Sequence, residues 1–151
     1  MLRAVLAVIV GYLVMALIVF TTFSLTYLLM GADGAFKPGT YEVTPLWLVV
    51  SFVFSFIAAV VGGWVCATIA GRATAPKGFA AVVFILGLIV ALSVIMSSDT
   101  RSQIREGNVG NMAAMQNAKQ PGWVALMNPL IAPAGILMGA RLKKEPRIPE
   151  L

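Results

Sequence analysis

Four long segments of the chain contain no Asp, Glu, Lys or Arg, and this pattern constrains the fold more than any other feature. The uncharged segments are residues 4–32, 43–71, 78–98 and 120–140. A helix needs roughly 20 apolar residues to cross a hydrocarbon layer about 30 Å thick, and each segment is long enough. We therefore predict four transmembrane helices. Their expected bounds are approximately residues 4–30, 46–71, 78–98 and 122–141.

The predicted fold class is all-α: an integral membrane four-helix bundle that forms a single domain over residues 1–151. With 60% hydrophobic and 11% charged residues, the chain carries more apolar surface than a soluble domain of this size buries. The short connection RATAPKG after residue 71 predicts that the helices on either side of it are antiparallel neighbours. We expect an up-down-up-down path, one longer polar loop at residues 99–120 and a basic tail at residues 142–151.

Lys and Arg residues in the loops predict the orientation in the membrane, because they concentrate on the cytoplasmic side. If both termini share one side, that side holds seven of them: Arg3, Arg72, Lys77, Arg141, Lys143, Lys144 and Arg147. The opposite side holds four: Lys37, Arg101, Arg105 and Lys119. We therefore expect an integral protein of the bacterial cytoplasmic (inner) membrane, with both termini in the cytoplasm. Amphipathic aromatic rings would gather at the outer interface. They are Tyr27, Tyr41, Trp47 and Trp123.

Basic residues near the cytoplasmic ends of the helices are expected to contact anionic lipid headgroups. They are Arg72, Lys77, Arg141, Lys143 and Lys144. Contact with lipid accounts for most of the net charge of +5. The expected partners are therefore membrane lipids, with the chain itself or other membrane subunits as further candidates. No nucleic acid is expected.

The sequence argues against several kinds of chemistry. It contains no histidine, which removes His-ligated metal sites and imidazole acid–base catalysis. Cys66 is the only cysteine, so it cannot form an intramolecular disulfide, and we interpret it as a compact apolar group. None of the four predicted helices contains an acidic residue, which argues against proton-coupled transport. We predict that the protein is not an enzyme and has no cofactor or metal.

Small residues recur at every fourth position of segment 46–71. They are Ser51, Ser55, Ala59, Gly63, Ala67 and Gly71, with a second row beside them formed by Ala58, Gly62, Cys66 and Ala70. In lipid, small residues mark the places where helix backbones approach closely. We predict that this is a helix-packing face. Its partner is either a neighbouring helix of the same chain or a helix of another subunit, and the sequence leaves both open.

The last apolar segment contains an unusual combination of Asn128, Pro129 and Pro133. Each proline removes a backbone hydrogen bond and can kink or loosen the helix. One interpretation is a broken helix that lines a cavity for a ligand or for water. The other is a structural kink, in which the Asn128 amide bonds to backbone carbonyls that Pro133 leaves free.

Two functions follow from these features. The leading hypothesis is a small, non-enzymatic multi-pass membrane protein that serves as a structural or assembly subunit and packs through the small-residue face of segment 46–71. The alternative is a small carrier or pore for a neutral or lipid-like molecule, with Asn128 and the proline-broken helix at its site. A lipid-acting enzyme is a third hypothesis. It ranks last because its polar residues would all have to come from the loops.

Overall fold

The computed structural model describes residues 2–71, 74–96 and 104–143. Within these residues the chain forms helices α1 (Leu2–Ala35), α2 (Pro45–Ala70), α3 (Thr74–Met96), α4 (Asn111–Asn117) and α5 (Gly122–Arg141). Helices α1, α2, α3 and α5 are each long and apolar enough to cross a membrane. The prediction of four long apolar helices is confirmed, and they fit an integral membrane protein.

The ends of the helices have local causes. Helix α1 continues to Ala35, but Gly31 has non-helical angles (φ 70°, ψ 178°), and this break coincides with the predicted end at residue 30. The Thr44 hydroxyl accepts a hydrogen bond from the Trp47 N–H, which caps the start of α2. Gly71 ends α2 in the left-handed conformation (φ 66°), where a glycine is least strained.

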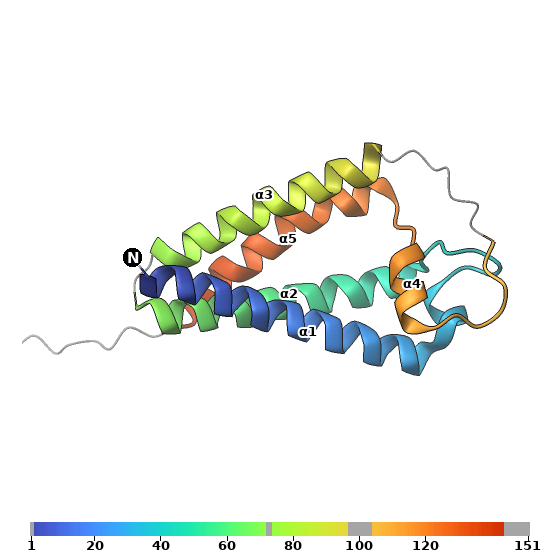
Figure 1. Cartoon of the computed structure of the whole chain (residues 1–151), viewed down its shortest axis with the longest axis horizontal. Helices are drawn as coiled ribbons and strands as arrows, with labels where there is room; N and C mark the ends of the chain where they lie inside the picture. Colours follow the sequence, from blue (N-terminus) through green and yellow to red (C-terminus); the bar gives the residue numbers. More distant parts are fainter. Residues whose placement is uncertain (1, 72–73, 97–103, 144–151) are drawn as a thin grey trace, which may run out of the picture.

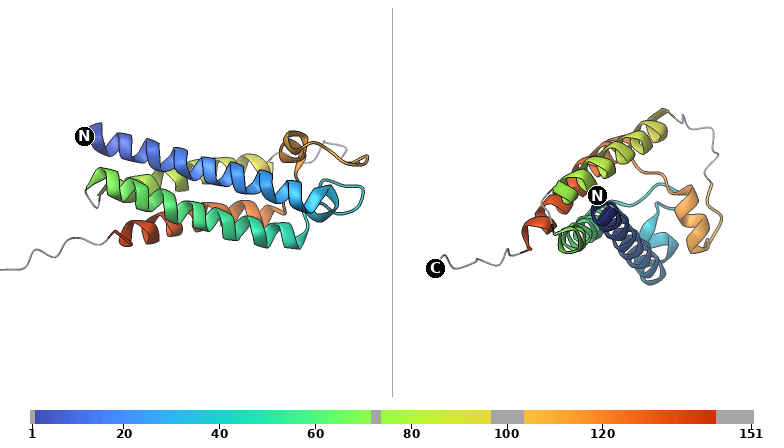
Figure 2. Two further views of the ribbon diagram at one scale, coloured as in Figure 1. Left: turned by 90° about the horizontal axis from the view of Figure 1, so that it is seen from below. Right: turned by 60° about the vertical axis from the view of Figure 1, so that its left-hand side comes forward.

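The four long helices share two ends. Helices α1 and α3 begin at the end that we call the N-terminal end, on the left of Figure 1, where α2 and α5 finish. The opposite end, which we call the loop end, carries α4 and the connections that join α1 to α2 and α3 to α5. Figure 2 shows α2 between α1 and α5, with α3 alongside α5.

Helices α2 and α3 touch far less than the short connection between them predicts. Helix α3 packs mainly along α5, and it meets α2 chiefly near the N-terminal end, where Ala70 and Phe79 belong to one core cluster. The prediction that they are packed neighbours was therefore wrong for most of their length. The reason is that the small-residue face of α2 is already covered by α1 and α5, while Gly87 of α3 lies directly against Pro129 of α5.

The second row of small residues lies against α1. A Cβ atom added at Gly62 would lie 2.8 Å from the carbonyl oxygen of Gly11, and one added at Gly11 would lie 2.9 Å from that of Gly62. Both distances are too short for a methyl group. The backbones of α1 and α2 are therefore in direct contact here, and only glycine fits at either position.

The part of the first row in the C-terminal half of α2 lies against the C-terminal half of α5. A Cβ atom added at Gly63 would overlap the backbone of Ile136, and one added at Gly139 would overlap the carbonyl oxygen of Val60. One added at Gly135 would lie 2.7 Å from the Cβ of Ala59. The close approach of helix backbones predicted for this face thus occurs within the chain.

Two separate core clusters hold the bundle together, one at each end. The cluster at the N-terminal end contains Ala7, Ala59, Cys66, Ala70, Ala75, Phe79, Ala80, Val83 and Ile136. The cluster at the loop end contains Tyr27, Ala32, Ala35, Phe36, Val43, Trp47, Leu48, Ala114 and Val124. Between the two clusters the helices leave unfilled space.

Candidate functional site

The described helices surround cavities, of which two adjoin each other. One, of about 480 Å³, is lined by α1, α3, α5 and the segment before α5. The other, of about 390 Å³, is lined by α1, α2, α5 and the α4 region. They have four lining residues in common: Tyr12, Met15, Gln120 and Asn128. Because the cavities adjoin through these residues, we treat them together as the inter-helix cavity.

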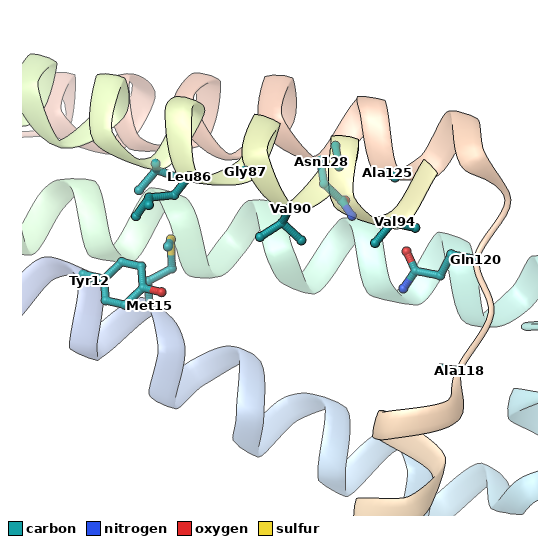
Figure 3. A pocket seen from close by; sticks show the side chains of 12 residues that line it. Tyr12, Met15, Leu86, Gly87, Val90, Val94, Ala118, Gln120, Ala125 and Asn128 are labelled. Atoms are coloured by element: carbon teal, nitrogen blue, oxygen red, sulfur yellow. The ribbon is translucent and has the colours of Figure 1, made fainter. Parts of the chain in front are cut away.

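The polar side chains of the inter-helix cavity come from α1, α2, α5 and the segment before α5. Figure 3 shows Asn128 of α5 and Gln120 of the segment before it toward the loop end of the cavity, and Tyr12 of α1 at the far side. Within the described part of the chain, none of these three side chains makes a hydrogen bond to another residue. Each of them is therefore available to a bound molecule.

Two further polar atoms belong to residues that line the cavity. Pro129 has no N–H, so the carbonyl of Ala125, which lines the cavity, lacks the donor that an α-helix would supply. The hydroxyl of Ser51, another lining residue, is buried and has no hydrogen-bond partner among the described residues. A buried polar atom without a partner is uncommon and calls for an explanation, such as water or a ligand.

The electrostatic character of the site is simple. No residue lining either cavity is charged. Burying an ion without a counter-charge costs several kcal/mol, so this lining favours a neutral guest. Within the described residues, no group of three or more Cys, Asp and Glu side chains could hold a metal ion.

Of the three residues predicted to form a cavity, only one lines the inter-helix cavity. Asn128 lines both cavities, whereas Pro129 packs against Gly87 of α3, and Pro133 lines neither cavity. Helix α5 runs as one helix through both prolines, so the predicted broken helix was wrong. The bond between the Asn128 amide and a freed carbonyl does not form among the described residues.

The predicted packing face divides between the cavity and the helix interface. Ser51 and Ser55 line the cavity. Ala59 and Gly63 contact α5, and Gly71 caps the end of α2. Ala67 is buried, and its carbonyl accepts hydrogen bonds from Gly71 N–H and from the Lys143 ammonium (3.3 Å).

The basic residues predicted to contact lipid lie at the N-terminal end where the structure describes them. Lys77 and Arg141 are exposed there. Lys143 donates to a carbonyl of α2, as does Arg3, whose Nε donates to Ile69 O at 2.7 Å. Arg72 and Lys144 lie outside the described residues.

Sequence reasoning missed Tyr12, Met15 and Gln120. A signal existed for Tyr12, because it is the only residue with a polar side chain between residues 4 and 20. Gln120 opens the last uncharged segment, where a polar residue at a helix entrance is unremarkable. No protein-family model, curated protein or solved structure matches the chain, so the cavity itself is the basis for a function.

Proposed function

We propose that the chain is a small, non-enzymatic membrane protein that binds a neutral, largely apolar molecule in the inter-helix cavity. The observation that carries this proposal is an uncharged cavity whose few polar groups, Asn128, Gln120 and Ser51, have no partner among the described residues. Small-molecule sites of about 300–1,000 Å³ commonly combine apolar walls with a few polar groups that orient the ligand.

The packing of α2 favours this function over an assembly subunit. The hypothesis of a docking face for another subunit needs the small residues of α2 to be free. Gly62 faces Gly11 of α1, and Gly63 faces Ile136 of α5, so the central part of both small-residue rows is occupied within the chain. Ser51 and Ser55, in the remaining part, line the cavity.

The proposed topology is four membrane crossings in an up-down-up-down path through a bacterial cytoplasmic membrane, with both termini in the cytoplasm. Of the described basic residues, four belong to the N-terminal end (Arg3, Lys77, Arg141 and Lys143) and three to the loop end (Lys37, Arg105 and Lys119), and this excess supports a cytoplasmic location for the N-terminal end. Helix α5, with 20 residues, is about 30 Å long, which matches the hydrocarbon core.

The proposal is tested by asking what the purified protein retains. The full chain and an Asn128→Leu variant are purified in a mild detergent, and bound molecules are identified by native mass spectrometry. Thr68→Val is the control, because it also replaces an uncharged polar side chain in a helix but lies outside the cavity lining.

We expect the wild type and Thr68→Val to retain the same neutral molecule and Asn128→Leu to lose most of it while keeping its helical circular-dichroism spectrum. Equal retention by all three proteins would contradict the proposal. So would a wild-type protein that retains nothing from membranes extracted under conditions that preserve its fold.

A further inference from the structure

The inter-helix cavity is closed toward the N-terminal end. A Cβ atom at Gly11 would lie 2.9 Å from Gly62 O and 3.2 Å from the ring of Phe79, so α1, α2 and α3 converge at this level. Phe79, Ala7 and Cys66 are fully buried. A molecule from the N-terminal side therefore has no open route through this cluster.

The described residues also cover the cavity toward the loop end. Residues 36–44 and 104–121, which we call the loop-end cap, cross this end of the bundle, and Met115, Ala118 and Gln120 of this cap line the cavity. Backbone hydrogen bonds fix the cap on both sides of Lys119: its N–H donates to Tyr41 O (2.8 Å), and its carbonyl accepts from Val43 N–H (3.1 Å).

A second set of contacts attaches the cap to α1. The Tyr27 hydroxyl donates to Val109 O at 2.6 Å, and the Asn111 amide donates to Ser24 Oγ at 2.9 Å. The buried Arg105 guanidinium pairs with Asp33 at 2.5 Å. With these bonds in place, the described cap is a fixed cover over the loop end.

The bundle is open on one side, between α1 and α3. Helix α2 packs along α1 and α5, and α5 packs along α3, but α1 and α3 touch only slightly and diverge toward the loop end (Figures 1 and 2). Tyr12, Leu86 and Val90 line the cavity and are nonetheless 45%, 48% and 61% exposed. The cavity therefore opens sideways, between these two helices.

The depth of the opening in the membrane indicates whether a ligand enters from water or from lipid. Tyr12 lies ten residues into α1, about 15 Å from its start, and Asn128 lies six residues into α5, about 9 Å from the loop end. In the proposed topology both are at hydrocarbon depth. The opening faces lipid chains, and a ligand that uses it is dissolved in the bilayer.

The distribution of polar groups determines the chemistry and the direction of that ligand. Gln120 and Asn128 lie toward the loop end, and their amides both donate and accept hydrogen bonds. Met15, Val83 and Leu86 make the deeper wall apolar. A phosphate or carboxylate head would find no Lys or Arg in this lining.

Building on the proposed function, we infer that the ligand is an uncharged long-chain lipid whose head carries hydroxyl or carbonyl groups, and that it moves from the bilayer into the cavity between α1 and α3. Its head bonds to Gln120 and Asn128, and its chain extends past Met15 and Leu86. A diacylglycerol is the simplest lipid with this chemistry.

The test uses the full chain in phosphatidylcholine bilayers with a diacylglycerol that carries a photoactivatable group on one acyl chain. We expect labelling at Met15, Leu86 or Val90. Unlabelled dioleoylglycerol should compete, whereas dioleoylphosphatidylglycerol and glycerol should not. Competition by the charged lipid or by glycerol would overturn the inference, while the Asn128→Leu retention result would still decide the proposed function separately.

A bulky side chain placed in the opening between α1 and α3 tests whether the ligand enters there. Val90→Trp should lower labelling at least fivefold. Val82→Trp is the matched control, because Val82 is also an exposed valine of α3 (46%) but does not line the cavity, and it should label like the wild type. Equal labelling of both variants overturns the lateral route.

Two further measurements distinguish entry between α1 and α3 from entry through the loop-end cap and from occupation of the opening by a second copy of the chain. Tyr27→Phe weakens the attachment of the loop-end cap and should leave the labelling rate unchanged; a faster rate would mean that the ligand passes through the cap and would overturn the inference. Crosslinks between two copies of the chain at Leu86 or Val90, in place of lipid labelling, would mean that a second copy fills the opening, and would overturn it as well.

Discussion

The contact of α2 with α5 leads to a quantitative prediction for Gly63→Ala. The added methyl group would overlap the carbonyl oxygen of Ile136, and the next nearest atoms also belong to the Ile136 backbone. The added Cβ would lie 2.1 Å from that oxygen, whereas non-bonded heavy atoms normally stay about 3.5 Å apart, so the helices must separate by more than about 1 Å. A gap of that size removes about half or more of the attraction between facing atoms, and close contact is what holds helices together in lipid.

The expected loss of stability follows from this geometry. Overpacking a well-packed interior costs about 1–3 kcal/mol. The obstacle at Gly63 is backbone, which cannot change rotamer, so we expect the upper end, about 3 kcal/mol. That corresponds to about a 100-fold change in the unfolding equilibrium constant.

The measurement is an unfolding titration with SDS in mixed micelles, followed by circular dichroism. Gly78→Ala is the matched control: it is also a glycine within a helix, but nothing lies within 4 Å of an added Cβ. Its stability should stay the same or rise by up to about 1 kcal/mol, because alanine is the better helix former. If the two variants unfold at the same SDS concentration, α2 and α5 are not in backbone contact and the reasoning is refuted.

Three further predictions test other parts of the structure. Ser51→Ala should raise the stability of the ligand-free protein by about 1 kcal/mol, because it removes a buried hydroxyl without a partner, yet lower the retention of the ligand in native mass spectrometry. Arg3→Gln should lower stability by about 0.3–1 kcal/mol in the same SDS titration, since a cation near the carbonyl end of α2 favours the helix dipole, and added salt should shrink the difference. Asp33→Asn should speed hydrogen exchange in residues 104–121, because the buried Arg105 guanidinium loses its charged partner; an unchanged exchange rate would mean that this ion pair does not secure the cap.

The four long helices were predictable because charge is costly in hydrocarbon, so the uncharged segments mark the spans directly. Their ends were close to the prediction where a local signal exists, such as Pro45 at the start of α2 or Gly71 at its end. The sequence also predicted a close backbone contact at Gly63, because small residues in lipid mark the places where helices approach each other.

The arrangement of the helices was not predictable in the same way. The choice of α5 as the main neighbour of α3 depends on the fit of Gly87 to Pro129, which no periodicity in either segment reveals. The cavity depends on the divergence of α1 from α3, and Tyr12 and Asn128 both line it although they are far apart in sequence. Sequence reasoning found Asn128 because an amide is unusual in an apolar helix, but of its two interpretations the one with a cavity required a helix break that does not occur.

The burial of Cys66 has a practical consequence. Its side chain is fully buried where α1 crosses α2, and a Cβ at Gly11 would lie 3.0 Å from that of Cys66. Since it is the only cysteine in the chain, a membrane-permeant maleimide can modify the protein only when these helices part. The modification rate of the native, unmutated protein therefore reports how often α1 and α2 part at this crossing.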